Sequence, residues 1–435
     1  MKQAPNPAQM ESPERQTRKI IRYARGAGTP KRKRRKKVMG TYINIGNAGF
    51  QSARNGEYVD KSPLIAAVNR TLFTEQQFSC VSRCRRFGKS MAAKMLYAYY
   101  DHSCDSRHLF ADLQIASDPT FEQHLNKYSA IYLDMTDFVS QFKGDDIVDK
   151  IDTTLLADVS KAYPDVPIEN GDSLMNYLLR VNMEKQEKFV FIIDEWDAIC
   201  REFKEGTKAM DSYVGWLRRM FKSQQAFMVF AGVYITGILP IKKYKTQSAL
   251  NNFTEYSMVE PVDMGQFFGF TKDEVRVLAE KYGMDFDELV KWYDGYQIGD
   301  EHSMFNPNSV MLAILYSHCY NNWWGTSSIH AFDDCINKNF DGVLDVLTKL
   351  FTGESHKIYT NSLDHYVWGR ITSKEDVLTA LIHFGYLTYN KTSSECYAPN
   401  YETLGRLSAH VGSLVGINYD KKLKTHQCKI ERTTN

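Results

Sequence analysis

The chain has 435 residues, of which 43% are hydrophobic and 24% charged, the composition of a globular protein with room for two or three domains. No uncharged apolar run is long enough to span a membrane, and the first forty residues lack the apolar core of a signal peptide. The eight cysteines form no CxxC pair and no Cys/His cluster with zinc spacing. We therefore expect reduced thiols, a cytoplasmic protein and no membrane partner.

The net charge of +2 combines a basic N-terminal segment with a mildly acidic remainder. Residues 1–38 carry thirteen Lys/Arg and two Glu, and the seven residues from Lys31 to Lys37 are all cations. Such a segment cannot bury a core, so we predict a disordered tail. It suits nucleic-acid binding through counterion release, or a localisation-like patch. Alternatively, Met39 is the true start, because the globular pattern begins there abruptly.

Residues 78–90 have the layout of a phosphate-binding loop. A short apolar strand leads into a cation-rich turn, and Gly-Lys-Ser then opens a helix with apolar residues three to four positions apart. Loop amides and a helix N-terminus offer N–H donors and partial positive charge to phosphates. We expect Lys89 to reach the β- and γ-phosphates and the Ser90 hydroxyl to bind Mg²⁺. The predicted nucleotide-binding residues are Arg83, Arg85, Arg86, Phe87, Gly88, Lys89 and Ser90.

The match to this loop is incomplete, because Arg83 stands where the full pattern has its first glycine. An ordinary strand-to-helix turn with a surface lysine would have the same sequence. The stretch therefore needs a second signal elsewhere in the chain.

That second signal is the run of five apolar residues at 189–193, which ends in Asp194 and Glu195. A run of this kind predicts a strand buried on both faces, with the two acids at the carboxyl edge of a parallel sheet, where ligands bind. We expect Asp194 to hold Mg²⁺ opposite Ser90 and Glu195 to polarise the attacking water. The alternative is a strand that ends in acids without a function.

Further strands are predicted at 129–135 and about 228–235, with helices between all of them. Alternating strands and helices predict an α/β fold with a parallel sheet wrapped on both faces. One strand separates the two functional strands in the sequence, so an extra strand is expected between them, as in P-loop ATPases that keep a catalytic Glu beside the Mg²⁺ Asp. The last of these strands ends at Thr236-Gly237, and Thr236 is a candidate catalytic residue that would sense the γ-phosphate or orient the water. A strand-end cap is the alternative for Thr236.

From residue 263 the sequence becomes helix-rich. Thr271 and Glu274 form a capping-box pattern, and further helices are expected to end before Gly295 and to run from about Val310 to Tyr320. The predicted domains are a disordered basic tail at 1–38, a P-loop domain at 39–262, a helical domain at 263–390 and a short remnant at 391–435.

Taken together, these segments resemble a bacterial family, the AAA-ATPase-like proteins with a C-terminal PD-(D/E)XK nuclease-like domain. The resemblance spans about Met39 to Asn400 and implies an ATPase with ATP and Mg²⁺ as ligands. Arg at position 83 is typical of the family's phosphate loop, although Cys84 replaces its usual Pro. The segments that carry the resemblance are Tyr58–Lys61, Arg85–Ser90, Ile193–Ala198, Thr236–Lys243, Ser248–Phe253, Phe267–Thr271, Trp292–Tyr296, Asn306–Pro307 and His383–Thr388.

The end of the chain departs from that family. Leu414–Asp420 and Thr425–Glu431 resemble the last strands of its nuclease domain, but the metal-binding Asp and the Glu-x-Lys strand that should precede them are missing. Cleavage of phosphodiesters by metal ions needs such convergent carboxylates. We therefore expect an internal deletion, joined near Gly405–Gly412, and no nuclease activity.

Three functions follow for testing. The first is an ATP-binding, Mg²⁺-dependent P-loop ATPase. The second is a nucleotide-dependent switch or scaffold without useful turnover, whose helical segment 263–388 meets a DNA or protein partner. The third, a nuclease, is disfavoured by the missing motif. The family resemblance suggests DNA-related or mobile-element biology. An oligomer is possible, but the oligomeric state stays open because no arginine finger can be assigned.

Overall fold

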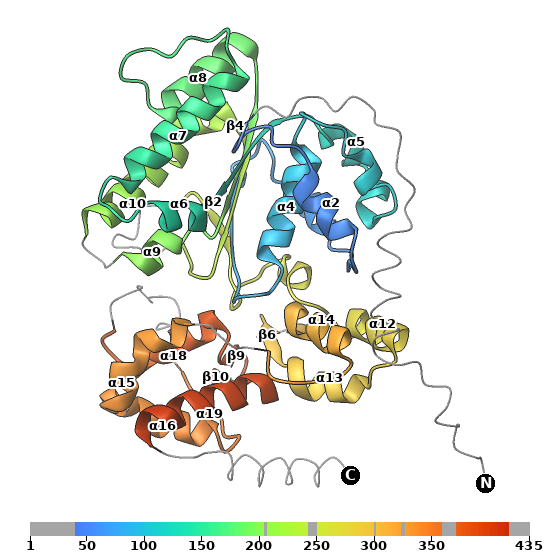
Figure 1. Ribbon diagram of the computed structural model, residues 1–435, viewed down its shortest axis with the longest axis vertical. Helices are drawn as coiled ribbons and strands as arrows, with labels where there is room; N and C mark the ends of the chain where they lie inside the picture. Colours follow the sequence, from blue (N-terminus) through green and yellow to red (C-terminus); the bar gives the residue numbers. More distant parts are fainter. Residues whose placement is uncertain are drawn as a thin grey trace, which may run out of the picture. The chain divides into compact units, whose positions relative to one another are not determined.

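The computed structural model describes residues 40–203, 207–241, 250–299, 302–322, 327–358 and 371–416 (Figure 1). Residues 39–435 form one compact unit, distinct from residues 1–38. The basic tail, the expected strand Thr425–Glu431 and most of Leu414–Asp420 lie outside the described residues. Whether 39–262, 263–390 and 391–435 are separate domains stays a prediction.

A five-stranded parallel sheet organises the first half of the chain, in the order β2-β3-β4-β1-β5. The strands are β1 (Phe78–Ser82), β2 (Ser129–Asp134), β3 (Phe189–Asp194), β4 (Phe230–Gly237) and β5 (Thr254–Tyr256). The predicted α/β fold is confirmed: a parallel sheet with helices on both faces is followed by a helix-rich region. A strand does lie between β1 and β3, but it is β4; β2, which separates them in sequence, pairs with the other side of β3.

Each face of the sheet has its own apolar core, because alternate residues of a strand point to opposite faces. In β3, Phe191 and Ile193 pack in one core, whereas Val190 and Ile192 pack in the other. Helices α2, α4 and α5 cover one face, and α6 to α10 cover the other (Figure 1). The predicted burial of β3 on both faces is therefore confirmed, since all six of its residues are buried.

The helices of this half follow the predicted alternation with strands. They are α2 (Ala48–Arg54), α3 (Pro63–Asn69), α4 (Lys89–Tyr100), η2 (Arg107–Leu109), η3 (Gln114–Ser117), α5 (Phe121–His124), α6 (Met135–Gln141), α7 (Ile147–Ala162), α8 (Leu174–Lys185), α9 (Ala198–Glu202), α10 (Lys208–Phe221) and α11 (Gln224–Val229). None of the described helices has the length and apolar character needed to cross a membrane.

The second half is helix-rich, with two small antiparallel sheets. Its elements are η4 (Gly265–Phe267), α12 (Lys272–Tyr282), α13 (Phe286–Tyr293), β6 (Tyr296–Ile298), β7 (His302–Met304), α14 (Pro307–Tyr316), η5 (Ser327–Phe332), α15 (Asp333–Asn337), η6 (Phe340–Gly342), α16 (Val343–Leu350), β8 (His356–Lys357), α18 (Lys374–Phe384), β9 (Thr388–Asn390), β10 (Glu395–Tyr397) and α19 (Tyr401–Val415). The capping box predicted from Thr271 and Glu274 is present at the start of α12.

The end of the described chain corrects one prediction. Leu414 and Val415 are the last residues of the helix α19, with Gly416 as its left-handed C-cap at φ 71°, and are not the start of a strand. The proposed deletion junction, 405–412, lies inside this continuous helix. Leu407 and Val411 of α19 belong to the same apolar core as one face of the large sheet. Helical periodicity and burial against that core therefore decide the structure of this segment.

Candidate functional site

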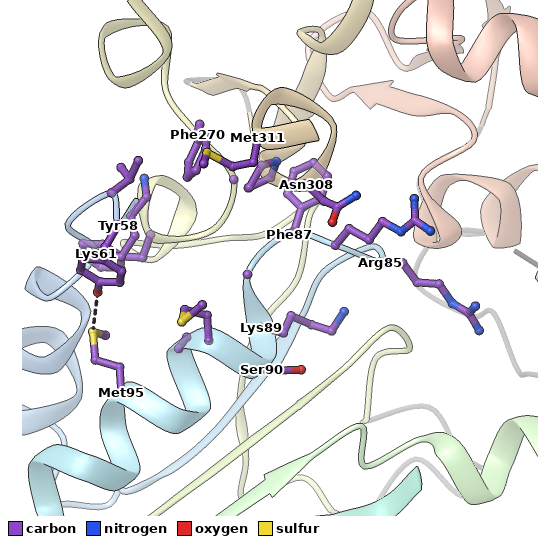
Figure 2. Close-up of a pocket in the computed structure, with 18 of the residues that line it drawn as sticks. Tyr58, Lys61, Arg85, Phe87, Lys89, Ser90, Met95, Phe270, Asn308 and Met311 are labelled. Atoms are coloured by element: carbon purple, nitrogen blue, oxygen red, sulfur yellow. Dashed lines mark hydrogen bonds between the residues drawn. The ribbon is translucent and has the colours of Figure 1, made fainter. Parts of the chain in front are cut away.

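A cavity of about 720 Å³ lies beside the N-terminus of α4 (Figure 2). Its walls come from residues 57–61, the loop between β1 and α4, the ends of β2 and β3, and the helical region. The polar lining residues are Glu57, Lys61, Arg85, Arg86, Lys89, Ser90, Asp134, Thr136, Glu195, Arg201 and Asn308. The main apolar ones are Tyr58, Val59, Phe87, Met91, Met95, Phe267, Phe270, Pro307 and Met311. Figure 2 shows Arg85 and Lys89 pointing away from Tyr58, whereas Lys61 lies beside Tyr58.

The loop between β1 and α4 turns sharply at the edge of this cavity. Gly88 is the N-cap of α4 with φ 85°, a left-handed conformation that suits glycine. Arg86 has φ 69°, which is uncommon for a residue with a side chain. The first amides of a helix have no partner within the helix, so a cavity at this point offers free donors to an anion.

Lys89 lies at the polar end of the cavity and is 4% exposed. Its Nζ donates to the carbonyl oxygen of Cys84 at 3.1 Å and lies 3.7 Å from Glu195 Oε1. The lysine is thus buried next to a carboxylate and a cavity, rather than against apolar side chains alone. An anion entering the cavity would compete with Glu195 for its charge.

Ser90 and Asp194 lie close together, as predicted, because the Ser90 hydroxyl is near enough to the Asp194 carboxylate to lower its pKa. Asp194 is 1% exposed and lies behind Ser90 rather than in the cavity wall. Its oxygens also accept hydrogen bonds from the Tyr132 hydroxyl and the Glu195 amide, both at 3.1 Å. Burial raises the pKa of Asp194 to about 6, which the Ser90 hydroxyl only partly offsets.

Glu195 follows β3 in a left-handed conformation, with φ 52°. Residues held in this way are found at functional sites, where the surrounding structure maintains the strain. Its carboxylate lies between Lys89 and Arg201, and it forms a short hydrogen bond with the Arg201 guanidinium. Burial would raise the pKa of Glu195, but Lys89, Arg201 and Arg85 outweigh burial and hold the pKa below its ordinary value. Glu195 is therefore ionised at neutral pH.

Arg201, on the short helix α9, was not predicted from the sequence. Its guanidinium binds Glu195 and lies 3.4 Å from the fully buried Asp197 carboxylate. Asp197 accepts from the amides of Ile238 and Leu239, at 3.3 and 3.1 Å, and so anchors the chain after β4. The i, i+4 spacing of Asp197 and Arg201 is that of an ion pair on a helix, a signal for their contact but not for the contact with Glu195. Asp134, by contrast, carries the same signal as Asp194, an acid at the end of an apolar strand, and it does line the cavity.

The structure does not bring Arg83 to the cavity, which corrects its assignment as a nucleotide-binding residue. The side chain is fully buried, and its guanidinium donates to the carbonyl oxygens of Ser82 at 2.8 Å and Tyr256 at 2.7 Å. It also lies over the Phe268 ring, 5.1 Å from the centroid. Arg83 thus joins the end of β1 to the segment after β5.

We expect Arg83→Ala to lower the free energy of unfolding by about 3 kcal/mol or more, because it leaves buried carbonyls without a donor. The affinity of the remaining folded protein for nucleotide should change little. Urea unfolding followed by circular dichroism measures the first effect. Arg70→Ala is the control, since Arg70 is 60% exposed and its pair with Asp263 is a surface contact expected to contribute under about 1 kcal/mol. Equal stabilities of the two variants would contradict the structural role of Arg83.

Thr236 is not brought to the cavity either. It is fully buried, and its hydroxyl donates to the carbonyl oxygen of Val81, its register partner in β1, at 3.1 Å. Its own carbonyl accepts from the amide of Trp196 at 3.0 Å. This geometry suits the alternative weighed for Thr236, a residue that fastens the strand end, and leaves the water-orienting role unassigned.

The other loop residues line the cavity as predicted, but two of them also hold the helical region. Phe87 packs edge-on against Tyr296 of β6, with ring centroids 4.9 Å apart. The Arg86 guanidinium donates to the carbonyl oxygen of Asn322 at 2.7 Å. The backbone amide of Asn322 donates in turn to the buried carboxylate of Glu402, on α19, at 2.8 Å. The loop is thus fixed to the second half of the chain.

Comparison with known proteins gives distant relatives. An uncharacterized protein from the vnfD 5′ region of Azotobacter chroococcum mcd 1 is 23% identical over 302 residues, covering 66% of this chain and 54% of that protein. The chain thus spans about half the length of this curated relative. The Aeropyrum pernix ORC2 protein, solved in ADPNP-ADP complexes, aligns with a TM-score of 0.45 and 12% identity over 84% of this chain and 98% of its own.

The Pyrobaculum aerophilum CDC6P structure aligns with a TM-score of 0.28 and 11% identity over 82% of this chain and 93% of its own. Likenesses this low say nothing about activity. Residues 44–246, which include the strands β1 to β4 and the loop before α4, match the model of the AAA-ATPase-like family, described as a predicted AAA-ATPase.

Proposed function

We propose that this protein binds ATP in the cavity beside α4 and hydrolyses it with Mg²⁺. The observation that carries the proposal is the meeting of Lys89, Ser90, Asp194 and Glu195 at one point, although two of them come from the first turn of α4 and two from the end of β3. The match of residues 44–246 to a family described as a predicted AAA-ATPase supports it independently. The free thiols of the described cysteines suit a reducing compartment such as the cytoplasm.

The two ends of the cavity suit the two ends of a nucleotide. Lys89, Arg85 and the amides at the start of α4 would hold the phosphates, since the cations and the helix N-terminus favour anions. At the other end, Tyr58, Phe270 and Met311 supply the apolar and aromatic surface on which a purine ring packs. Both the sheet and the second half of the chain would therefore contact the nucleotide.

The oxygen donors at the cavity fit Mg²⁺, which prefers carboxylate, hydroxyl and phosphate oxygens and keeps several waters. Ser90 and Asp194 would hold the ion, with Asp134 close enough to raise the pKa of Asp194 through its charge. The bound ion would neutralise charge on the phosphates. Glu195, ionised at neutral pH, would accept the proton of the attacking water.

Glu195 must first exchange partners. Lys89 and Arg201 hold its carboxylate. Phosphates arriving at Lys89 would draw that cation away and free one carboxylate oxygen for a water molecule. Nucleotide binding and assembly of the catalytic site would then be one event.

Asp194→Asn tests the metal site through two quantities, the stability of the protein and its Mg²⁺-dependent ATP binding. The pKa of Asp194 is raised from 3.8 to about 6 in the folded protein, so folding favours its protonated form. The protonated carboxyl contributes its whole stabilisation below pH 3.8, and this contribution is lost as the pH rises through 6. A side chain that cannot ionise should therefore stabilise the nucleotide-free protein at pH 8, by about 1–3 kcal/mol. The same change should weaken Mg²⁺-dependent ATP binding about 10-fold or more.

Thermal unfolding at pH 5 and pH 8 and ATP titrations with Mg²⁺ or with chelator provide the two readouts. Asp149→Asn, at an exposed position of α7, is the control and should change neither. If Asp194→Asn kept the Mg²⁺ dependence of the unchanged protein, the assignment of Asp194 as a metal ligand would fail.

A nucleotide-dependent switch is the second candidate, favoured by the contact from Arg86 through Asn322 to Glu402. This path links the phosphate loop to the last described helix, so occupancy of the loop could be reported to a DNA or protein partner. A switch without turnover predicts partner binding that requires ATP and is equally strong in Glu195→Gln. We propose no nuclease activity, because the sequence from Asn390 to Leu414 holds no Asp and no Glu-x-Lys.

A further inference from the structure

Two histidines and an aspartate from distant parts of the chain meet in the helical region, away from the nucleotide cavity. His330 belongs to η5, Asp333 is the first residue of α15, and His410 is on α19. One atom from each of the three side chains lies within 4.8 Å of the other two. Among the described residues, these three side chains form the one group of His, Cys, Asp or Glu residues whose ligand atoms lie close enough together to hold a metal ion.

Both imidazoles direct a ring nitrogen at the same carboxylate. His410 Nε2 lies 2.8 Å from Asp333 Oδ1, and His330 Nδ1 lies 3.1 Å from Asp333 Oδ2. The centroids of the two imidazole rings are 4.8 Å apart, and the ring planes form an angle of 74°. Ligands at bond lengths of about 2.1 Å around a tetrahedral zinc ion are separated by about 3.4 Å. The ion therefore fits between the three side chains after small rotations.

The surroundings fix one ligand and leave another free to adjust. The His410 side chain is 6% exposed and lies on α19 between core residues Leu407 and Val411, so its position is set by packing. The His330 side chain is 58% exposed and can rotate toward an ion. Asp333, 28% exposed, lies between them. A rigid buried ligand with two more accessible ones leaves a fourth position open to water.

We propose that His330, Asp333 and His410 form a binding site for a divalent transition metal ion of the zinc class. Two imidazoles and one carboxylate match the ligands of three-residue zinc sites, and imidazole selects zinc, copper, nickel or iron over magnesium and calcium. The ion joins α15 to α19, two helices far apart in the sequence. Such a crosslink stabilises the folded chain, because the unfolded chain does not hold the three ligands together.

The test uses the full chain, stripped with chelator and then returned to buffer with excess Mg²⁺, which occupies hard oxygen sites. Zinc is added and its stoichiometry is measured by mass spectrometry after gel filtration, together with the thermal unfolding midpoint. We expect one zinc ion per chain and a rise in Tm of about 3 °C or more. Cobalt in place of zinc should show the d–d bands of nitrogen and oxygen ligands without a thiolate charge-transfer band.

Three variants and a control separate a metal site from a hydrogen-bond network. Asp333→Asn keeps hydrogen-bonding capacity but loses the charge, so it should lose the zinc ion and the Tm shift. His410→Ala should do the same. Because His410 is buried, that variant can fail to fold, so His330→Ala, at an exposed position, provides a second test of the imidazole ligands. His318→Ala, at an exposed histidine outside the group, should keep both. No zinc uptake by the unchanged protein, or equal uptake by all variants, would overturn the proposal.

Discussion

Glu195→Gln is expected to keep ATP binding and to lower the hydrolysis rate by about 10²- to 10³-fold, the range in which general bases contribute. The amide has the shape of the carboxylate but cannot take a proton from water. Binding should remain because Lys89 and the loop amides are unchanged. If anything, Lys89 becomes freer for phosphate, since the neutral side chain no longer holds it at 3.7 Å as an ion pair.

Steady-state phosphate release and a fluorescent-nucleotide titration together separate these effects, because one reports turnover and the other affinity. Glu202→Gln is the matched control: Glu202 is an exposed glutamate at the end of α9, close in sequence but outside the cavity lining. It should behave as the unchanged protein. Equal hydrolysis rates in the unchanged protein and Glu195→Gln would remove Glu195 from the proposed chemistry while leaving nucleotide binding intact.

Lys89→Ala is expected to weaken ATP binding about 100-fold or more, because removing one partner of a desolvated charge pair costs several kcal/mol. Lys89 is the buried cation at the polar end of the cavity, and no neighbouring side chain stands in its place on α4. Hydrolysis should become undetectable at ATP concentrations that saturate the unchanged protein. Glu195 should stay folded in place through its contact with Arg201.

Calorimetric titration with a slowly hydrolysed ATP analogue measures this loss, and circular dichroism verifies the fold. Lys94→Ala is the control, since Lys94 lies on the same helix with an exposed side chain outside the cavity lining. An unchanged affinity in Lys89→Ala would mean that the cavity is not a phosphate site. The zinc proposal would be untouched by that outcome, because its three ligands lie elsewhere.

Local patterns in the sequence predicted the first half of the site. An apolar strand, a turn and Gly-Lys-Ser at a helix start define the loop through local backbone geometry, and the structure shows that arrangement around Gly88. Acids at the end of an apolar strand predicted Asp194 and Glu195 in the same way. The meeting of Ser90 with Asp194 then follows, because parallel strands that hold a Gly-Lys-Ser loop and an acid pair present both at one sheet edge.

The chain's own packing decided what local patterns could not. Arg83 looked like part of a phosphate loop, but burial between β1 and the residues after β5 turned its guanidinium to backbone carbonyls. Thr236 lies at the end of β4, as predicted, but its hydroxyl donates to the carbonyl oxygen of Val81 in the neighbouring strand. The expected remnant at 391–435 begins with the strand β10, which pairs with β9, and the helix α19, which packs in the apolar core.

By itself, the sequence determined the α/β alternation, the loop that opens α4 and the two acids at the end of β3, since each depends on residues close together in the chain. Only the tertiary structure decided which distant side chains meet: Arg201 with Glu195, Arg86 with Asn322, and His410 with Asp333. Those pairs depend on where helices pack, and helix packing is set by the shape of buried surfaces rather than by any spacing along the chain.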